Sequence, residues 1–227
     1  MAGLPCGVRL CSLRLVMVTI PLRPIPIRLL ILILALAGIG VLIWTVARPA
    51  IGDSFITFVQ RSQELSSEAR LQGADTAIGL AERDPLAHLG RGAVYLAAAN
   101  EEQNEMRLKT ALEELRTATK ISPEDYRAWL ALGRALDRSG VLTEARSALE
   151  RSIALAPRHF EPRWAMGNHL LRAGDREASF AQLRQALAGR PSALPLVFDY
   201  AWEAFQGDGR AIFSALAEVQ TTSHLAL

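Results

Sequence analysis

Cysteine is almost absent from this sequence of 227 residues, and both cysteines lie close to its N-terminus. No cysteine follows Cys11, and the other is Cys6. A disulfide framework or a cysteine-ligated zinc site is therefore excluded from the rest of the chain. Aromatic residues make up only 6% of the sequence, so a folded core must consist mainly of aliphatic side chains.

Acidic residues are absent from residues 1–52, which carry five arginines. Subtracting these five from the 25 Lys and Arg leaves 20 basic residues against 23 acidic ones, so the remainder has a net charge of −3. The net charge of +2 therefore originates in the N-terminal segment. Because nucleic-acid binding calls for a basic domain face, we expect no nucleic-acid partner.

Charge is also absent from residues 29–47, which begin at Leu29 and end at Ala47. As a helix these residues span roughly 28 Å, close to the hydrocarbon thickness of a bilayer. They predict a transmembrane helix, whereas the alternative, a buried core helix, usually keeps a polar face. A cleaved signal peptide is disfavoured, because the apolar run is long and Arg48-Pro49 follows it. We therefore expect an uncleaved signal anchor.

The arginines on either side of this span predict its orientation. Arg9, Arg14, Arg23 and Arg28 precede it, and only Arg48 closely follows it. The positive-inside rule then places the N-terminus in the cytoplasm and the rest of the chain outside it, in the periplasm of a Gram-negative cell. The opposite topology remains the alternative. Residues 1–28 form a leader that we expect to be disordered, in which Met17 is an alternative start.

Residues 126–193 consist of two blocks of 34 residues that align with each other. The alignment pairs Gly133 with Gly167, Gly140 with Gly174, Leu149 with Leu183 and Pro157 with Pro191. The first block reads Trp129-x2-Leu132-Gly133-x2-Leu136, then Ala145-x3-Leu149, then Pro157. This pattern resembles the tetratricopeptide repeat, a helix–turn–helix unit of about 34 residues. The resemblance implies an all-α fold, an α-solenoid of antiparallel helix pairs that follows the transmembrane helix.

The matched glycines have two different physical roles. Gly133 and Gly167 lie within predicted helices, where glycine is tolerable if the partner helix packs too closely for a side chain. Gly140 and Gly174 lie at the predicted turns, where a positive φ is favourable for glycine.

The rest of the chain reads as weaker copies of the same unit. Pro85 closes a divergent first pair, in which we expect one helix from Asp53 to about Leu71 and a second over residues 74–83. The closing unit has a predicted apolar stripe of Ile212, Phe213, Leu216 and Val219. The expected segments are a linker at 48–52, a divergent pair at 53–85, a unit with an insertion near Asn100–Asn104 at 86–125, repeats at 126–159 and 160–193, a degenerate unit or cap at 194–220 and a tail at 221–227.

No constellation for catalysis occurs in the sequence. The histidines, His88, His159, His169 and His224, have no metal-ligand spacing, and the phosphate-binding and nucleophile-elbow motifs are absent. We therefore expect no enzymatic activity, no catalytic residue, no metal, no cofactor and no small-molecule substrate.

The resemblance also implies a binding surface. In tetratricopeptide domains the second, fifth, ninth, twelfth and thirteenth residues of each unit commonly line a concave groove. In this sequence they are Arg127, Leu130, Arg134, Asp137 and Arg138 in the first block and Glu161, Trp164, Asn168, Leu171 and Arg172 in the second. Such side chains suit a peptide, because guanidinium binds carboxylates and indole binds an apolar anchor. The family's carboxylate-clamp subtype is not supported, since Leu130 and Arg134 replace its Lys and Asn. The alternative is that these arginines only solvate a helical face.

The sequence therefore predicts a membrane-anchored scaffold with a protein or peptide partner, acting in the assembly of an envelope or membrane complex. A second hypothesis is an accessory subunit or regulator of a membrane enzyme complex, held mainly through its transmembrane helix.

Overall fold

The computed structural model describes residues 27–61 and 65–217, and these form helices and turns without any strand. The helices are α1 (Ile27–Arg61), α2 (Ser67–Leu80), α3 (Pro85–Glu102), α4 (Glu105–Ile121), α5 (Tyr126–Arg138), α6 (Leu142–Leu155), α7 (Phe160–Arg172), α8 (Arg176–Gly189), the 3₁₀ turn η1 (Pro191–Ala193), α9 (Leu194–Ala204) and α10 (Gly209–Ala217). The chain divides into two compact units, Met1–Trp44 and Thr45–Leu227. Residues 1–26 of the predicted leader (1–28), the tail at 221–227 and Val219 lie outside the described residues, whereas Ile27 and Arg28 belong to α1.

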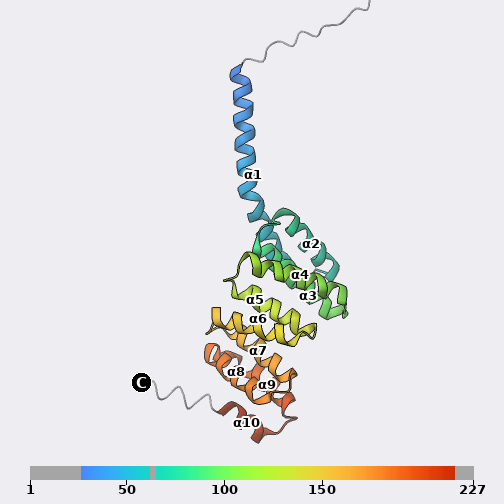
Figure 1. The fold of residues 1–227 in the computed structure, drawn as a ribbon, viewed down its shortest axis with the longest axis vertical. Coiled ribbons are helices and arrows are strands. Elements are labelled where there is room, and N and C mark those ends of the chain that lie inside the picture. The colour runs from blue at the N-terminus through green and yellow to red at the C-terminus, as the bar shows by residue number, and fades with distance from the viewer. Residues whose placement is uncertain (1–26, 62–64, 218–227) are drawn as a thin grey trace, which may run out of the picture. The chain divides into compact units, whose positions relative to one another are not determined.

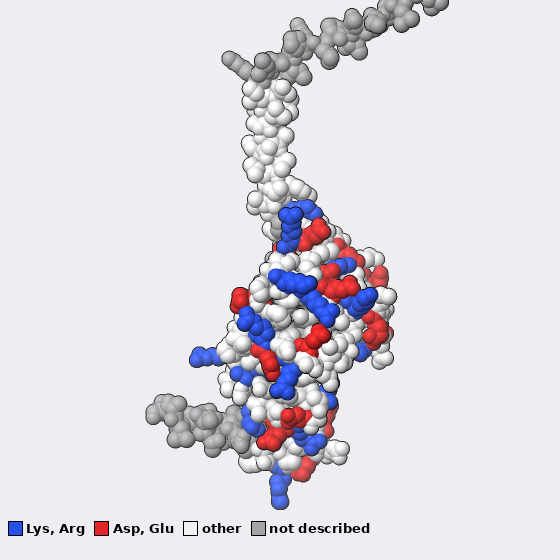
Figure 2. Space-filling view, in the orientation of Figure 1, with Lys and Arg blue, Asp and Glu red and all other residues white. Residues whose placement is uncertain are grey.

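Within the first unit, the described residues are 27–44 and form the beginning of α1. Its side chains from Leu29 onward are exposed and carry no charge, as the white helix in Figure 2 shows. By length and composition α1 is a candidate membrane span over Leu29–Val59. A signal sequence near the N-terminus has the same properties.

The second unit begins within α1, which continues through the predicted linker. The expected break at residues 48–52 and a new helix at Asp53 are therefore wrong. A proline inside a helix costs about 3 kcal/mol, but packing of the following turns offsets this cost. Gly52 is buried so close to α2 that an added Cβ would lie 2.8 Å from the Cβ of Ala81. Ile56 and Val59 are also buried against α2 and α3.

The boundary between α1 and α2 also differs from the expectation. We expected one helix as far as about Leu71 and a second over residues 74–83, whereas α1 ends at Arg61 and α2 begins at Ser67. The cause is an N-cap, because Ser66 Oγ accepts a hydrogen bond from the backbone N–H of Ala69 at 3.2 Å. The C-terminal part of α1 and the whole of α2 still form the first helix pair of the second unit.

The helices from α3 to α8 pack as consecutive pairs that stack along the chain (Figure 1). Glycine makes this packing close. A Cβ on Gly133 would lie 2.7 Å from Leu149 Cγ, and one on Gly167 would lie 2.7 Å from Leu183 Cδ2. Gly140 and Gly174 have φ values of +79° and +86° at the turns within the pairs. Both predicted roles of glycine are thus confirmed.

The unit before the aligned pair has longer helices than the units that follow it. α3 has 18 residues, compared with 13 in α5 and in α7, and α4 has 17, compared with 14 in α6 and in α8. α3 ends at Glu102, its C-cap Gln103 has a φ of +50°, and Asn104 then caps α4 by accepting hydrogen bonds from the N–H groups of Met106 and Arg107. The insertion therefore lengthens both helices of this unit.

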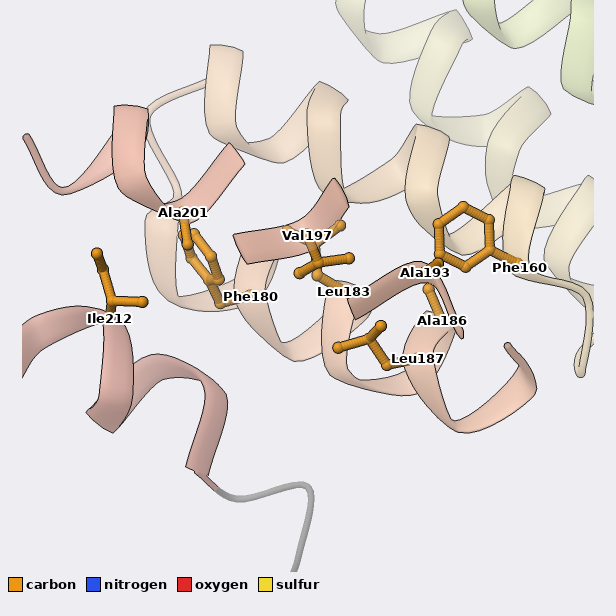
Figure 3. Packing of buried hydrophobic residues seen from close by; sticks show 9 residues of the cluster. All are labelled: Phe160, Phe180, Leu183, Ala186, Leu187, Ala193, Val197, Ala201 and Ile212. Atoms are coloured by element: carbon orange, nitrogen blue, oxygen red, sulfur yellow. The ribbon is translucent and has the colours of Figure 1, made fainter. Parts of the chain in front are cut away.

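The last helices close one end of the stack over an apolar cluster from α7 to α10 (Figure 3). Ile212 of α10 joins this cluster, but Phe213 is 74% exposed, so its place in the predicted stripe is wrong. A shift of one residue gives the buried position to Ile212, and no further unit among the described residues covers Phe213. The turn glycine Gly207 follows Gly174 by 33 residues instead of 34, which brings Ile212 to the position of the buried Ser179.

Candidate binding groove

A hollow of about 650 Å³ runs across the first helices of three consecutive pairs. We call it the central groove. It is lined by Ala93, Leu96, Ala97 and Asn100 from α3, by Ala131, Arg134, Asp137 and Arg138 from α5, by Leu149 from α6 and by Ala165, Asn168 and Arg172 from α7. The small residues form its walls, so the long arginine side chains have room to reach across it.

Five of the ten residues predicted to line a groove line this one, namely Arg134, Asp137, Arg138, Asn168 and Arg172. Leu130 does not, because its side chain is buried between α5 and α7 with Leu149 and Met166. Its place in the predicted set is therefore wrong.

The other four predicted residues do not line the central groove. Arg127 forms an ion pair with Asp125 at 2.8 Å, and Glu161 forms one with Arg190 at 3.0 Å. Leu171 is partly buried. Trp164 stacks on Phe160, with 5.6 Å between the ring centroids.

The one carboxylate of the central groove, that of Asp137, is already neutralised. Asp137 is buried and accepts a hydrogen bond from His169 Nδ1 at 2.7 Å. Its other oxygen forms an ion pair with Arg172. Burial lowers the pKa of His169, the charge of Arg146 lowers it further and Glu150 opposes the shift.

Arg134 and Arg138 keep their positive charge in the groove. Arg138 Nε donates a hydrogen bond to Asn100 Oδ1 at 3.1 Å, and this partner is neutral. Burial lowers the pKa of Arg134 and the charge of Glu161 raises it, but guanidinium stays protonated at neutral pH. With three arginines and one aspartate, the central groove has an excess of two positive charges.

Asn168 brings an unsatisfied amide to the same surface. Its Oδ1 atom is buried and accepts no hydrogen bond from any described residue. A buried acceptor without a donor costs about 1–3 kcal/mol.

Comparison with known proteins identifies the fold that carries this groove. A family model described as tetratricopeptide repeat matches residues 105–167. These residues carry tetratricopeptide repeats. No curated protein is similar enough in sequence to count as a relative.

Solved structures show the same tetratricopeptide fold over most of the chain. A thermophilic tetratricopeptide protein of Thermus thermophilus is 20% identical, with a TM-score of 0.55 over 74% of this chain and 96% of that one. A MamA protein is 14% identical, with a TM-score of 0.56 over 79% and 95%. MamA from Desulfovibrio magneticus RS-1 is 19% identical, with a TM-score of 0.52 over 63% and 76%. The predicted all-α tetratricopeptide solenoid is thus confirmed.

The tetratricopeptide period also leads to two exposed aromatic residues that sequence reasoning missed. Adding 34 to Trp164 and Asn168 gives Phe198 and Trp202 of α9, whose rings are 6.1 Å apart. These side chains are 44% and 52% exposed. The sequence alignment stopped at Ala193, although the same period continues into this unit.

Other parts of the tetratricopeptide domain offer less. A second hollow, of about 510 Å³, lies beside α5 and α6 and is mainly apolar. Among the residues that the structure describes, no three His, Cys, Asp or Glu side chains are close enough to hold a metal ion. The central groove is therefore the candidate site.

Proposed function

We propose that this protein is a membrane-anchored scaffold that holds an extended segment of a partner protein in its central groove. The complex it helps to assemble would lie in the cell envelope or a membrane. The observation that carries the proposal is the groove itself, in which Arg134 and Arg138 bring positive charge to the side of Asn168. Acidic side chains of a partner suit these guanidinium groups. No step in this function requires catalysis, a cofactor or a nucleic acid.

The second part of the proposal is the anchor. The uncharged stretch of α1 from Leu29 to Ala47 would cross the membrane once, with the N-terminus in the cytoplasm and the repeats in the periplasm. Its support is the exposed apolar surface of this stretch and the arginines that precede it. A phosphatase fused after Leu227 should be active, since this reporter works only outside the cytoplasm. A fluorescent cytoplasmic fusion without phosphatase activity would reverse the orientation.

Site-specific photo-crosslinking in native membranes tests the groove. A photoreactive amino acid at Ala131 lies in the central groove, whereas one at Ala154, on α6, lies outside it. We expect the variant at position 131 to form an adduct with a partner protein and the variant at position 154 to form none. The same adducts from both positions, or none from position 131, would exclude the groove as the binding site.

One observation favours a second function, that of an accessory subunit held through α1. Gly38 and Gly40 leave open surface on the apolar helix, with no other atom within 4 Å of an added Cβ. Small residues allow close contact with another transmembrane helix. Replacing residues 29–47 by an unrelated apolar helix separates the two functions. The scaffold would keep its crosslink from position 131, whereas the subunit would lose its complex.

A further inference from the structure

The groove surface changes its chemistry from one end to the other. On α5 and α7 it carries Arg134, Arg138 and Arg172. On α9, Trp202 occupies the position equivalent to Arg134, and Phe198 lies about one helical turn before it. A single bound segment that follows the first helices of successive pairs would therefore meet positive charge first and an apolar surface second.

Phe198 and Trp202 of α9 are more exposed than the aromatic rings of α7 and α8. Phe160 and Phe180 are buried in the apolar cluster, and Trp164 is covered by Tyr200, with 5.2 Å between the ring centroids. Phe198 and Trp202 contact each other but keep about half of their surfaces exposed. Adjacent exposed apolar side chains of this size are typical of an interaction site.

Charge also changes sign between the two ends. Asp199 is exposed on α9 at the position equivalent to Ala165, which lines the central groove. An acidic residue of a partner would be attracted to Arg134 and Arg138 and repelled from Asp199. The acidic residue and the apolar residue of a partner are thus assigned to different ends.

We infer that the partner segment carries an acidic residue and, about five or six residues away, an aromatic or large aliphatic residue. This inference rests on the proposed function and specifies its ligand. The spacing follows from the stack, because helices pack about 8–10 Å apart and two such steps separate α5 from α9. An extended chain advances about 3.3 Å per residue, so five or six residues cover that distance.

A second copy of this chain is a poorer occupant of the same surface. A twofold contact centred on the arginines would place Arg134 and Arg138 of one copy against the same residues of the other. Such like charges repel, whereas an acidic segment neutralises them. The ligand that fits both ends is therefore a segment of a different sequence.

Peptide binding to the full-length protein in nanodiscs tests the inference. The probes are labelled peptides in which Asp and Trp are separated by five polar residues, made in both orders, and their affinities are measured by fluorescence anisotropy. Empty nanodiscs correct for binding of the tryptophan to lipid. Control peptides replace Asp by Asn, replace Trp by Ser or shorten the spacer to one residue. We expect one order to bind, and each control to bind roughly tenfold more weakly.

Variants of the protein test which of its residues recognise the Trp and which recognise the Asp of the peptide. Trp202→Ala should abolish the preference for Trp over Ser while the preference for Asp over Asn remains. Arg134→Gln together with Arg138→Gln should have the opposite effect. The inference would be overturned if affinity did not depend on the Asp, on the Trp or on the length of the spacer between them. It would also be overturned if the protein formed a dimer that Trp202→Ala converts to a monomer. If no peptide binds but position 131 still forms its crosslink, the inference fails and the proposed function stands; loss of that crosslink defeats the proposed function itself.

Discussion

His169 Nδ1 lies 2.7 Å from Asp137 Oδ1, and only 4% and 3% of the two side chains are exposed. The pair joins α7 to α5 and so connects two successive repeats beneath the central groove. Arg172 contacts the same carboxylate from the groove side. Because Asp137 is held by both partners, its charge is not available to attract a cation from a ligand.

Removing this carboxylate should destabilise the domain. Asp137→Ala would leave the His169 N–H without an acceptor in a buried site, at a cost of about 1–3 kcal/mol in the free energy of unfolding. Asp137→Asn keeps an acceptor oxygen and should cost less. Denaturant unfolding followed by tryptophan fluorescence measures both variants. Equal stability of Asp137→Ala and the wild type would show that the pair contributes nothing.

The lowered pKa of His169 predicts the pH dependence of stability. In the unfolded chain a histidine takes up a proton near pH 6.5, whereas in the folded chain it takes one up only at lower pH. Below pH 6.5 the unfolded state therefore binds more protons, and stability falls as the pH falls toward the folded pKa. His169→Asn, which keeps an N–H donor, should lose less stability than the wild type between about pH 7.5 and about pH 5.5. A wild type that instead gains stability relative to this variant on acidification would indicate a charged His169 with a raised pKa.

Alanine at two helical glycines should have opposite effects. Gly133→Ala places a Cβ 2.7 Å from Leu149 Cγ, and such overpacking costs about 1–3 kcal/mol. Gly79→Ala in α2 has no other atom within 4 Å, so it should stabilise its helix by up to about 1 kcal/mol. Thermal unfolding by circular dichroism compares the pair. If both substitutions stabilise, α5 and α6 do not pack as closely as described.

Two phenylalanines near the end of the stack form another matched pair. Phe180 is 2% exposed and lies 4.9 Å from Phe205 between ring centroids, so Phe180→Ala should cost about 3–5 kcal/mol. Phe213 follows Phe180 by 33 residues but has no further unit to cover it among the described residues. Phe213→Ala should change the free energy of unfolding by less than about 0.5 kcal/mol. A large loss of stability from Phe213→Ala would mean that α10 packs in the 34-residue register.

Local signals made the central repeats predictable. Tyr126 and Phe160 begin α5 and α7 at the expected block boundaries, and glycines with positive φ mark the turns. The length of the first helix was determined instead by packing between residues that are distant in the sequence. Pro49 is a strong local signal for a break, but the contacts of Gly52 with α2 keep the helix continuous.

The groove could be predicted only in part, for similar reasons. Arg134 and Asn168 follow from the repeat register, because each comes directly after a helical glycine that packs on its partner helix. The prediction for Leu130 was wrong because α7 covers the face of α5 on which Leu130 lies. The α3 wall was missed because an insertion hides the period in that unit, and Phe198 and Trp202 were missed because the alignment stopped at Ala193.

Charge reversal in the central groove, measured by the crosslink from position 131, tests the central claim most directly. Arg134→Glu together with Arg138→Glu should lower the yield of the partner adduct at least about tenfold, since both arginines would then repel an acidic segment. The matched control is Lys109→Glu together with Lys120→Glu, two exposed residues of α4 outside the groove, which should leave the yield unchanged. An adduct that survives the arginine reversal, or that the lysine reversal reduces equally, would contradict partner binding in this groove.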